Sequence, residues 1–360
     1  VSFIIQNDIR VVFPGTEWYL CNGIKDFLEI HTPNVKVFGP DRYQSHIEGS
    51  KLFSKILMNK LKIPTAPFYY VKTPAHFWCD ECLDDIVVKY CGLANGKGVY
   101  LPRQSESIRE ILNDLEKFGK DGFIVENRYR GTEVSVMGFC NGKETFLMPC
   151  AQDYKNIYDG NRGPNTGGMG SICPVHTLSH DELNIVKQYM DLVVRELKYI
   201  GILYAGIMKT RDGLFFLEFN CRFGDPETQS ILNLLETPLF DVIMDCMAGE
   251  TPKIKWNDFH SATIVLSHNL YPNERLKKPI LMTWTEQIDN NVKTYFSNVT
   301  TDASGNHYTT GGRVLSLTSV DMTREVALRN IYSNIDKIQY EGVYYRKDIG
   351  TIFNNVVLED

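Results

Sequence analysis

The sequence predicts a multidomain protein that combines α/β and α+β architecture. At 360 residues, the chain is long enough for two or three domains with substantial cores. Near the start, short apolar runs that end in Pro-Gly or Gly-Pro flank a helical segment, which is typical of a parallel α/β domain. From residue 259 onward the chain is rich in strand-like segments with one helical stretch, which indicates an α+β domain.

Composition describes an ordinary globular protein and excludes some partners. Lys and Arg number 38 against 44 Asp and Glu, and there is no strongly basic tract, so nucleic acid is not an expected partner. No apolar run reaches transmembrane length and the first residues lack a secretory pattern, so we expect no membrane partner and a cytoplasmic location. The nine cysteines are scattered, which favours reduced thiols. Cys79 and Cys82 lack two further ligands at comparable spacing, so a metal role for them is not favoured.

The amino-terminal segment is predicted to be a partial α/β domain over residues 1–40, as if its beginning were missing. Apolar runs at 9–13 and 35–38 each end at a turn, and a helical segment lies between them at about 22–30. The middle domain, predicted over 41–258, begins with an amphipathic helix at 50–62 that Pro64 stops.

Two lysines in this middle domain suggest a phosphate site. Lys89 closes a strand at 85–89, and Lys97 lies within the glycine-rich loop 92–98. Glycines let backbone N–H groups approach anions, and ammonium groups offset the phosphate charge. The loop does not match the Walker pattern. A structural hairpin with a solvated lysine explains the same residues.

The next segments suggest a nucleoside site. Residues 107–110 form a capping-box pattern before an apolar helical face. Residues 122–126 and 133–138 alternate like paired strands, and Glu126 and Glu133 could hold an adenosine through its ribose hydroxyls. Surface acids on an antiparallel pair are the alternative.

The stretch 152–170 is rich in glycine and cannot build a core. A long loop of this kind inside a compact domain is usually functional or disordered, and its polar residues favour an ordered loop that covers a substrate. A capped helix follows from Ser179, and then a hairpin whose arms are 202–208 and 214–220.

The end of that hairpin is the strongest candidate for a metal site. In a strand, Glu218, Asn220 and Arg222 share one face, and apolar side chains share the other. A carboxylate and an amide oxygen suit Mg²⁺, and Arg222 could clamp a carboxylate or a phosphate bidentately. The first arm contains no acid, so a second metal ion would have to share Glu218. An ordinary strand whose polar face meets water is the simpler explanation. The last domain is predicted over 259–360.

Several motifs occur together in a fixed order along the chain. They are Phe38-Gly39-Pro40, Glu48-Gly49-Ser50-Lys51, Ile63-Pro64-Thr65-Ala66, Val88-Lys89, Gly96-Lys97-Gly98, residues 163–170 and 217–229, Gly311-Gly312-Arg313-Val314-Leu315 and Arg346-Lys347-Asp348-Ile349-Gly350. On these motifs the chain resembles the phosphoribosylamine–glycine ligase (glycinamide ribonucleotide synthetase) family of ATP-grasp enzymes. The resemblance covers essentially the whole chain.

The resemblance implies an ATP-grasp fold with a truncated amino-terminal α/β lobe and a small carboxyl-terminal α+β lobe. It implies ATP-dependent ligation of glycine to 5-phosphoribosylamine through a glycyl phosphate, in purine synthesis. ATP and Mg²⁺ (or Mn²⁺) are the implied cofactors, and glycine and 5-phosphoribosylamine the small-molecule partners. A place within a longer or multifunctional purine-pathway chain is compatible with it.

The resemblance also assigns roles to individual residues. Glu218 and Asn220 are expected to bind the metal, and Arg222, Lys155 and Asp225 to act in catalysis. The expected ATP residues are Lys89, Gly96, Lys97, Gly98, Glu126 and Glu133. The expected substrate residues are Asp153, Asp159, Asn165, Thr166, Gly167, Gly168 and Glu227. Asp225 and Glu227 are expected to orient Arg222 and the glycine-rich loop.

The chain also departs from the family pattern. The family's amino-terminal phosphate loop is absent, which puts binding of the phosphoribosylamine phosphate in doubt. Asn95, Tyr154 and Asn156 replace other residues of the family's motifs, and Asn161 replaces an acid that could grip the ammonium of glycine. Two alternatives therefore stay open: a nucleotide-binding remnant without acceptor binding, and an ATP-grasp ligase that uses another amine.

Overall fold

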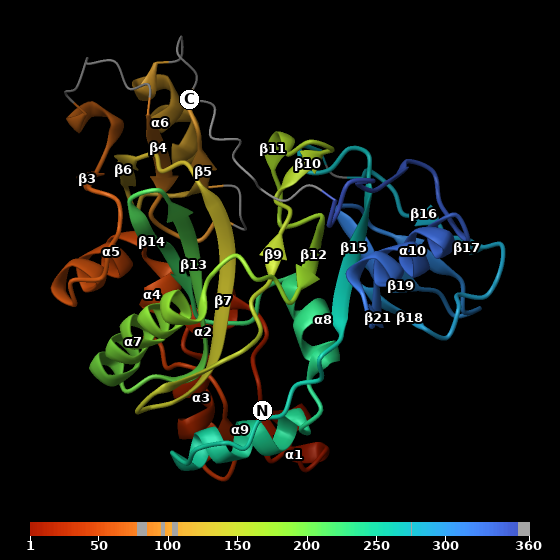
Figure 1. Ribbon diagram of the computed structural model, residues 1–360, viewed down its shortest axis with the longest axis horizontal. Helices are drawn as coiled ribbons and strands as arrows, with labels where there is room; N and C mark the ends of the chain where they lie inside the picture. The colour runs from red at the N-terminus through yellow and green to blue at the C-terminus, as the bar shows by residue number, and fades with distance from the viewer. Residues whose placement is uncertain (78–84, 95–97, 103–106, 275, 352–360) are drawn as a thin grey trace.

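The computed structural model of the protein describes residues 1–77, 85–94, 98–102, 107–274 and 276–351. Figure 1 shows three β-sheet regions beside one another, with the amino-terminal helices below the central one. The central sheet carries a long helix on one face, and the carboxyl-terminal strands form the right-hand part of the view. The α/β and α+β multidomain architecture predicted from the sequence is confirmed.

The amino-terminal segment forms the expected strand–helix–strand unit. Strand β1 (Val11–Val12) pairs in parallel with β2 (Lys36–Val37). The helices of this segment are α1 (Ser2–Gln6), α2 (Glu17–Cys21) and α3 (Ile24–His31). Leu20 of α2 and Leu28 of α3 are buried, so the helices contribute to the core.

The first sheet has the antiparallel order β3–β6–β4–β5. Its strands are β3 (Phe68–Val71), β6 (Phe123–Asn127), β4 (Ile86–Tyr90) and β5 (Val99–Tyr100). Helix α6 (Ile108–Leu115) buries its apolar face against this sheet. The capping box predicted at 107–110 is wrong, because the side chain of Ser107 accepts no hydrogen bond from the helix. The short helices α4 (His46–Gly49), η1 (Pro74–His76) and η2 (Glu116–Phe118) complete this part.

Helix α5 (Lys51–Lys60) lies between this sheet and the central sheet. Ser50 caps it by accepting a hydrogen bond from the Phe53 amide at 3.2 Å. The helix predicted at 50–62 is thus confirmed.

The central sheet has the order β14–β13–β7–β8. Its strands are β14 (Gly213–Asn220), β13 (Ile200–Thr210), β7 (Thr132–Asn141) and β8 (Thr145–Leu147), and α7 (His180–Leu197) covers one face. Ser179 and Glu182 form a complete capping box at the start of α7. The predicted pairing of 122–126 with 133–138 is wrong, because β6 belongs to the first sheet and β7 pairs with β13 and β8.

The third sheet joins the middle of the chain to its carboxyl-terminal part. It runs β18–β21–β15–β12–β9, with β23 paired to β15. Its strands are β18 (Val292–Phe296), β21 (Arg313–Asp321), β15 (His260–His268), β12 (Gly170–Cys173), β9 (Gln152–Asp153) and β23 (Val343–Tyr344), and α10 (Arg324–Ile335) packs on it. Most of its strands come from the carboxyl-terminal part, and β12 and β9 from the middle of the chain extend the sheet. The predicted boundary at 258/259 stays a prediction.

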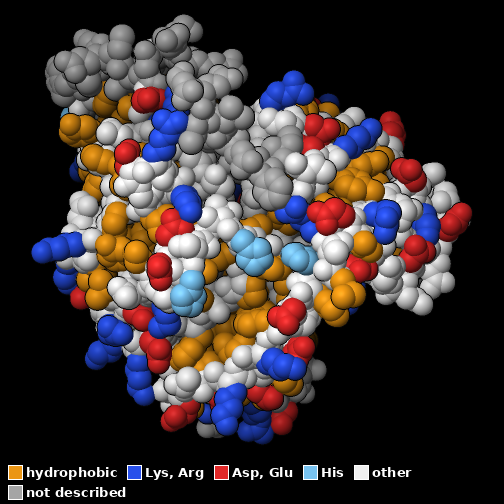
Figure 2. Space-filling model, viewed as in Figure 1, with side chains coloured by type: hydrophobic (Ala, Val, Ile, Leu, Met, Phe, Trp, Pro, Cys, Tyr) orange, Lys and Arg blue, Asp and Glu red, His pale blue; other side chains and the backbone are white. Residues whose placement is uncertain are grey.

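Shorter elements complete the structure. They are the strands β16 (Ile280–Leu281), β20 (His307–Thr309) and β19 (Val299–Thr301), the pair β17 (Thr283–Trp284) and β22 (Ile338–Gln339), and the helices α8 (Glu227–Ile231), η3 (Leu232–Leu234) and α9 (Leu239–Ala248). The cysteines in the described ranges are free thiols, and Cys79 and Cys82 lie outside those ranges. None of the helices that the structure describes is long and apolar enough to span a bilayer. Figure 2 shows acidic and basic side chains interspersed over one face of the molecule.

The glycine-rich stretch 152–170 is more regular than the predicted loop. It contains β9 and the antiparallel pair of β10 (Asn156–Tyr158) and β11 (Arg162–Asn165). The fully buried Arg346 fixes this hairpin from the carboxyl-terminal part by donating to the Asn156 carbonyl at 3.0 Å and to Asn161 Oδ1 at 2.9 Å. Hydrogen bonds across the hairpin make it an ordered element.

Candidate active site

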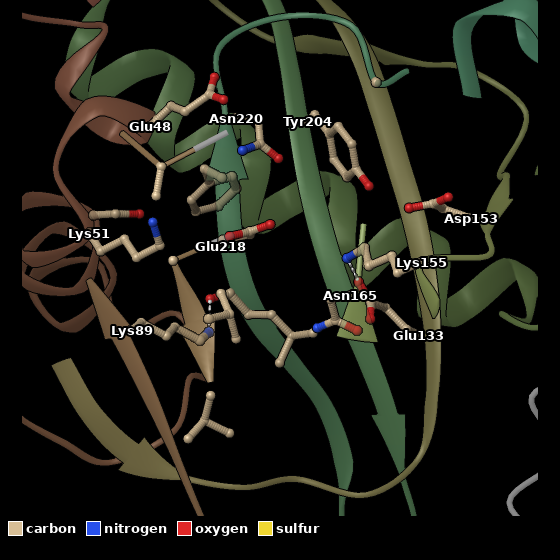
Figure 3. Close-up of a pocket in the computed structure, with 18 of the residues that line it drawn as sticks. Glu48, Lys51, Lys89, Glu133, Asp153, Lys155, Asn165, Tyr204, Glu218 and Asn220 are labelled. Carbon is tan, nitrogen blue, oxygen red and sulfur yellow. Dashed lines mark hydrogen bonds and ion pairs between the residues drawn. The ribbon is translucent and has the colours of Figure 1, made fainter. Parts of the chain in front are cut away.

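A cleft of about 770 Å³ lies between the first sheet and the central sheet. Strands of both sheets, helix α5, residues 15–17 and the turn 165–167 line it. Figure 3 shows Glu218 in its centre, with Lys51 and Lys89 on one side and Lys155 on the other. The cleft therefore brings together residues that lie far apart in the sequence.

The end of β14 presents the metal candidates to the cleft. Glu218 lies opposite Gly206 of β13, and Asn220 lies opposite Tyr204. Phe219 is buried, as the strand alternation predicts. The pairing of β14 with β13 is irregular at Leu217, between Phe216 and Glu218. The Leu217 carbonyl accepts a hydrogen bond from Lys89 Nζ at 3.3 Å.

The side-chain oxygens of Glu218 and Asn220 have no partner in the part of the protein that the structure describes. Among the described residues, the Glu218 carboxylate and the Asn220 amide form neither a side-chain hydrogen bond nor an ion pair. Burial alone would raise the pKa of Glu218, but Lys155 and Lys89, with further cations nearby, lower it, so the group is an anion. An ionised carboxylate and an amide oxygen fit Mg²⁺, which completes its shell with phosphate and water oxygens. The residues present therefore fit the implied metal.

A buried triad lies at the end of the cleft where Lys89 lies, and the sequence predicts ATP there. Glu126, which is 3% exposed, pairs with Lys89 Nζ at 2.6 Å and with Lys55. Lys55 also donates to Thr65 Oγ1 at 2.6 Å. Burial would raise the pKa of Glu126, but the two lysines lower it. Both oxygens of Glu126 are engaged by lysines, so Glu126 acts as their counter-ion, and its expected role toward ATP stays a prediction.

The remaining lysines of the cleft differ in their partners. Lys155 pairs with Glu133, as the dashed line in Figure 3 shows. Burial opposes the charge of Lys155, but Glu133 and Glu218 outweigh burial and raise its pKa. Lys51 forms no ion pair with a described residue, and burial lowers its pKa. Lys51 is thus available to an anionic ligand.

Arg222 is oriented by acids from the amino-terminal part of the chain. Its Nε donates to Glu17 at 2.8 Å, and its Nη2 pairs with Glu48 at 2.9 Å. Glu48 also accepts a hydrogen bond from the Cys221 amide at 2.8 Å. The expectation that Asp225 and Glu227 orient Arg222 is therefore wrong.

Asp225 contacts the turn 165–168 through Arg313, which agrees with its expected role toward the glycine-rich loop. Arg313 Nη2 pairs with Asp225 Oδ2 at 2.8 Å, and Nη1 donates to the Gly167 carbonyl at 2.5 Å. Thr166 Oγ1 accepts from the Gly168 amide at 3.0 Å and donates to the Lys155 carbonyl at 2.8 Å. These bonds hold the turn against the mouth of the cleft.

Glu227 and Asp153 lie together at the far end of the cleft. Glu227 Oε1 accepts from Tyr204 Oη at 2.8 Å and from Ser135 Oγ at 3.1 Å. Asp153 Oδ1 is buried and has no hydrogen-bond partner. Burial and the charge of Glu227 raise the pKa of Asp153 well above its usual range.

Some expected site residues are not brought into the cleft. Asp159 accepts a hydrogen bond from the Lys347 amide at 2.9 Å, and neither Asp159 nor Asn161 lines the cleft. Gly168 lies behind Asp153 and does not line the cleft either, whereas Gly98, Asn165, Thr166 and Gly167 do. Gly96 and Lys97 fall outside the described residues.

Sequence reasoning missed several residues that line the cleft. The missed residues are Glu48, Lys51, Lys55, Tyr204 and Arg313. Glu48, Lys51 and Arg313 occur within the sequence motifs on which the resemblance rests. Those motifs could have identified them as site residues. Lys55 lies four residues after Lys51 on α5, so helical spacing places both on the same face.

Comparisons with known proteins support one family. The model of the phosphoribosylglycinamide synthetase ATP-grasp (A) domain matches residues 49–228, and that of the C domain of the same family matches 261–352. A phosphoribosylamine–glycine ligase of Caldanaerobacter subterraneus subsp. tengcongensis is 38% identical over 97% of this chain and 86% of its own length. A bifunctional purine biosynthetic protein of Schizosaccharomyces pombe is 34% identical over 97% of this chain and 46% of its own length. The crystal structure of a phosphoribosylamine–glycine ligase from Thermotoga maritima superposes with a TM-score of 0.78 at 31% identity, covering 90% of this chain and 84% of that one.

Proposed function

The chain belongs to the phosphoribosylglycinamide synthetase family, and from this premise we propose that it ligates glycine to 5-phosphoribosylamine with ATP. The products are glycinamide ribonucleotide, ADP and phosphate, in purine biosynthesis. The observation that carries the proposal is the pair of uncommitted oxygens on Glu218 and Asn220, in a cleft that also holds Lys51, Lys89, Lys155 and Arg222.

The reaction consists of two displacements. A carboxylate oxygen of glycine forms a bond to the γ-phosphorus of ATP, and the bond from that phosphorus to ADP breaks. The amine of phosphoribosylamine then attacks the carbonyl carbon of glycyl phosphate, inorganic phosphate leaves, and the amine loses a proton. The first step brings two anions together and the second releases anionic phosphate, so cations and fixed positions supply most of the rate.

Different residues of the cleft have different roles in the two displacements. Lys89 and Lys51 face the phosphates, and Glu126 with Lys55 fixes the position of Lys89. Arg222, held by Glu17 and Glu48, presents a planar cation to the developing acyl phosphate. Lys155 lies near the glycine carboxylate, and Arg313 holds the turn that covers it.

Glu218 and Asn220 would hold Mg²⁺, which would polarise phosphate oxygens when bound. Mn²⁺ as a substitute stays a prediction, as does a cytoplasmic location. The bifunctional relative from Schizosaccharomyces pombe is consistent with this chain being part of a multifunctional protein. This also stays a prediction. A nucleotide-binding remnant would have no physical need for an uncommitted carboxylate beside four cations, so we favour the ligase.

The test is phosphate release from ATP by the purified protein with Mg²⁺ and glycine, with and without phosphoribosylamine. We expect release coupled one to one to amide formation when both substrates are present. An equal rate with another amine in place of phosphoribosylamine would support the alternative acceptor. No release under any of these conditions would contradict the ligase proposal.

A further inference from the structure

Both polar groups of the Gly167 backbone are bound by side chains of the carboxyl-terminal part. Tyr271 Oη accepts a hydrogen bond from the Gly167 amide at 2.8 Å, and Arg313 Nη1 donates to the Gly167 carbonyl. Arg313 lines the cleft and Tyr271 does not, so Tyr271 lies behind the turn 165–168. We propose that Tyr271 is a positioning residue that keeps this turn closed over the glycyl phosphate and so excludes water. The inference rests on the proposed function and extends it to the coupling of ATP use to amide formation.

The turn is packed tightly on both sides. On one side, a Cβ at Gly168 would clash with the ring of Pro226. On the other side, a Cβ at Gly167 would lie 3.1 Å from Arg313 Cζ and 3.2 Å from Tyr271 Oη. Neither position has room for a side chain, so the backbone of the turn lies in direct contact with the groups that hold it.

Tyr271 is itself fixed by the end of β15. Its amide donates to the His268 carbonyl at 2.9 Å, and the His268 amide donates to the Gly312 carbonyl at 3.0 Å. His268 is the last residue of β15 and is buried. Gly312 directly precedes Arg313, so the two side chains that hold Gly167 come from hydrogen-bonded neighbouring segments. Figure 1 shows the hairpin of β10 and β11 near the upper end of β15.

The position of the turn is transmitted to Lys155. The Thr166 amide and the Thr166 hydroxyl both donate to the Lys155 carbonyl at 2.8 Å. Thr166 is 4% exposed, and it lines the cleft together with Lys155 and Gly167. A displacement of Gly167 would therefore reach the residue proposed for the glycine carboxylate and open the cleft beside the reacting group.

Water is the competitor that a closed turn excludes. A water oxygen can attack the carbonyl carbon of glycyl phosphate, and the bond from that carbon to the phosphate oxygen breaks. Glycine is then released as its carboxylate, inorganic phosphate leaves, and the two protons of the water pass to the phosphate and to solvent. The net reaction is hydrolysis of ATP without an amide. The amine of phosphoribosylamine attacks the same carbon, so the access of water decides how much phosphate is released for each amide.

The experiment uses Tyr271→Phe, which keeps the ring and removes only the acceptor for the Gly167 amide. Phosphate release from Mg²⁺-ATP and glycine is measured without phosphoribosylamine, and phosphate and amide are both measured with it. We expect release without phosphoribosylamine to rise roughly fivefold, the factor for one neutral hydrogen bond, and the ratio of phosphate to amide to rise above one. The KM for ATP should change little, because Lys89 and Glu126 keep their ion pair.

The matched control is Tyr344→Phe, which removes another tyrosine hydroxyl that binds the same hairpin. Tyr344 Oη donates to the Ile157 carbonyl at 2.9 Å, and neither residue lines the cleft, so this variant should keep the wild-type ratio. If Tyr271→Phe does not fold, Gly167→Ala is the second variant. Its Cβ would press against Tyr271 Oη and Arg313, so it should show the same excess of phosphate.

The outcomes separate the inference from the ligase proposal. Phosphate and amide that fall in step in Tyr271→Phe, with an unchanged release in the absence of phosphoribosylamine, would show a merely structural role and overturn the inference. An equal excess of phosphate in Tyr344→Phe would also overturn it, because any loosening of the hairpin would then suffice. Both results would leave the ligase intact. A wild-type protein without glycine-dependent phosphate release would contradict the ligase proposal and the inference with it.

Discussion

The two ends of the cleft differ in whether their carboxylates form ion pairs within the protein. At the end proposed for the nucleotide, Glu126 is neutralised by Lys55 and Lys89 within the protein. At the end proposed for the metal and glycine, Glu218, Asp153 and Glu227 form no ion pair with a described residue. Removal of one partner of a buried ion pair leaves the other charge uncompensated, whereas a carboxylate without a partner in the protein is available to a ligand. Substitutions at the first end should therefore act mainly on stability, and those at the second end on turnover.

The largest expected effect tests the unpaired end. Glu218→Gln keeps the shape of the side chain and removes its charge, so metal-dependent phosphate release should fall by about 10³-fold or more. Thermal unfolding should change little, because Glu218 has no hydrogen bond or ion pair to lose. Steady-state kinetics and calorimetry check both parts. Retained turnover would show that Glu218 is not a metal ligand.

The paired end should respond in the opposite sense. Glu126→Gln leaves Lys55 and Lys89 buried without a counter-ion, so the free energy of unfolding should fall by about 3–5 kcal/mol. Denaturant unfolding measures this loss. The matched control is Lys55→Met with Glu126→Gln, which removes one charge of each sign and should recover much of it. A Glu126→Gln variant as stable as the wild type would contradict the claim that substitutions at this end act mainly on stability.

The same ion pairs predict a dependence on pH. The pKa of Glu126 in the folded protein is lowered from its ordinary value of 4.5, against burial, by Lys89 and Lys55. Its stabilising contribution is therefore complete above the ordinary value and is lost as the pH falls through the folded value. The stability difference between wild type and Glu126→Gln should shrink in acid below about pH 4.5. A difference that is constant with pH would argue against an ionised Glu126.

The smallest effect should come from Ser135→Ala. Glu227 loses the hydrogen bond from Ser135 at 3.1 Å but keeps the one from Tyr204. One neutral hydrogen bond of this kind contributes about 1 kcal/mol, which corresponds to roughly a fivefold rise in the KM for glycine. Kinetics at saturating ATP measure it. An unchanged KM would show that the hydrogen bond from Ser135 does not position Glu227 for substrate binding.

Local patterns made much of the fold predictable. Helix α5 follows from apolar spacing with Ser50 before it and Pro64 after it, and α7 follows from Ser179 with Glu182. Long-range pairing was not predictable in this way. The run from 133 has the alternation of a strand, but alternation does not say that its partner is β13 and not β6.

The candidate site shows the same division between local and long-range information. The types and spacing of Glu218, Asn220 and Arg222 indicated the metal end, and the structure places all three in the cleft. The partners of Arg222 lie 174 or more positions away in sequence, at Glu48 and Glu17, so no local pattern could connect them. Asp159 was expected near substrate because it lies in the glycine-rich stretch, but the fold turns it toward Lys347.

The most direct test of the central claim is a single assay of phosphate release from Mg²⁺-ATP by the purified protein, with glycine and phosphoribosylamine both present. The account predicts one phosphate released for each glycinamide ribonucleotide formed, and loss of both products in Glu218→Gln. Phosphate release that does not depend on glycine, or none at all from a folded wild-type protein, would contradict it.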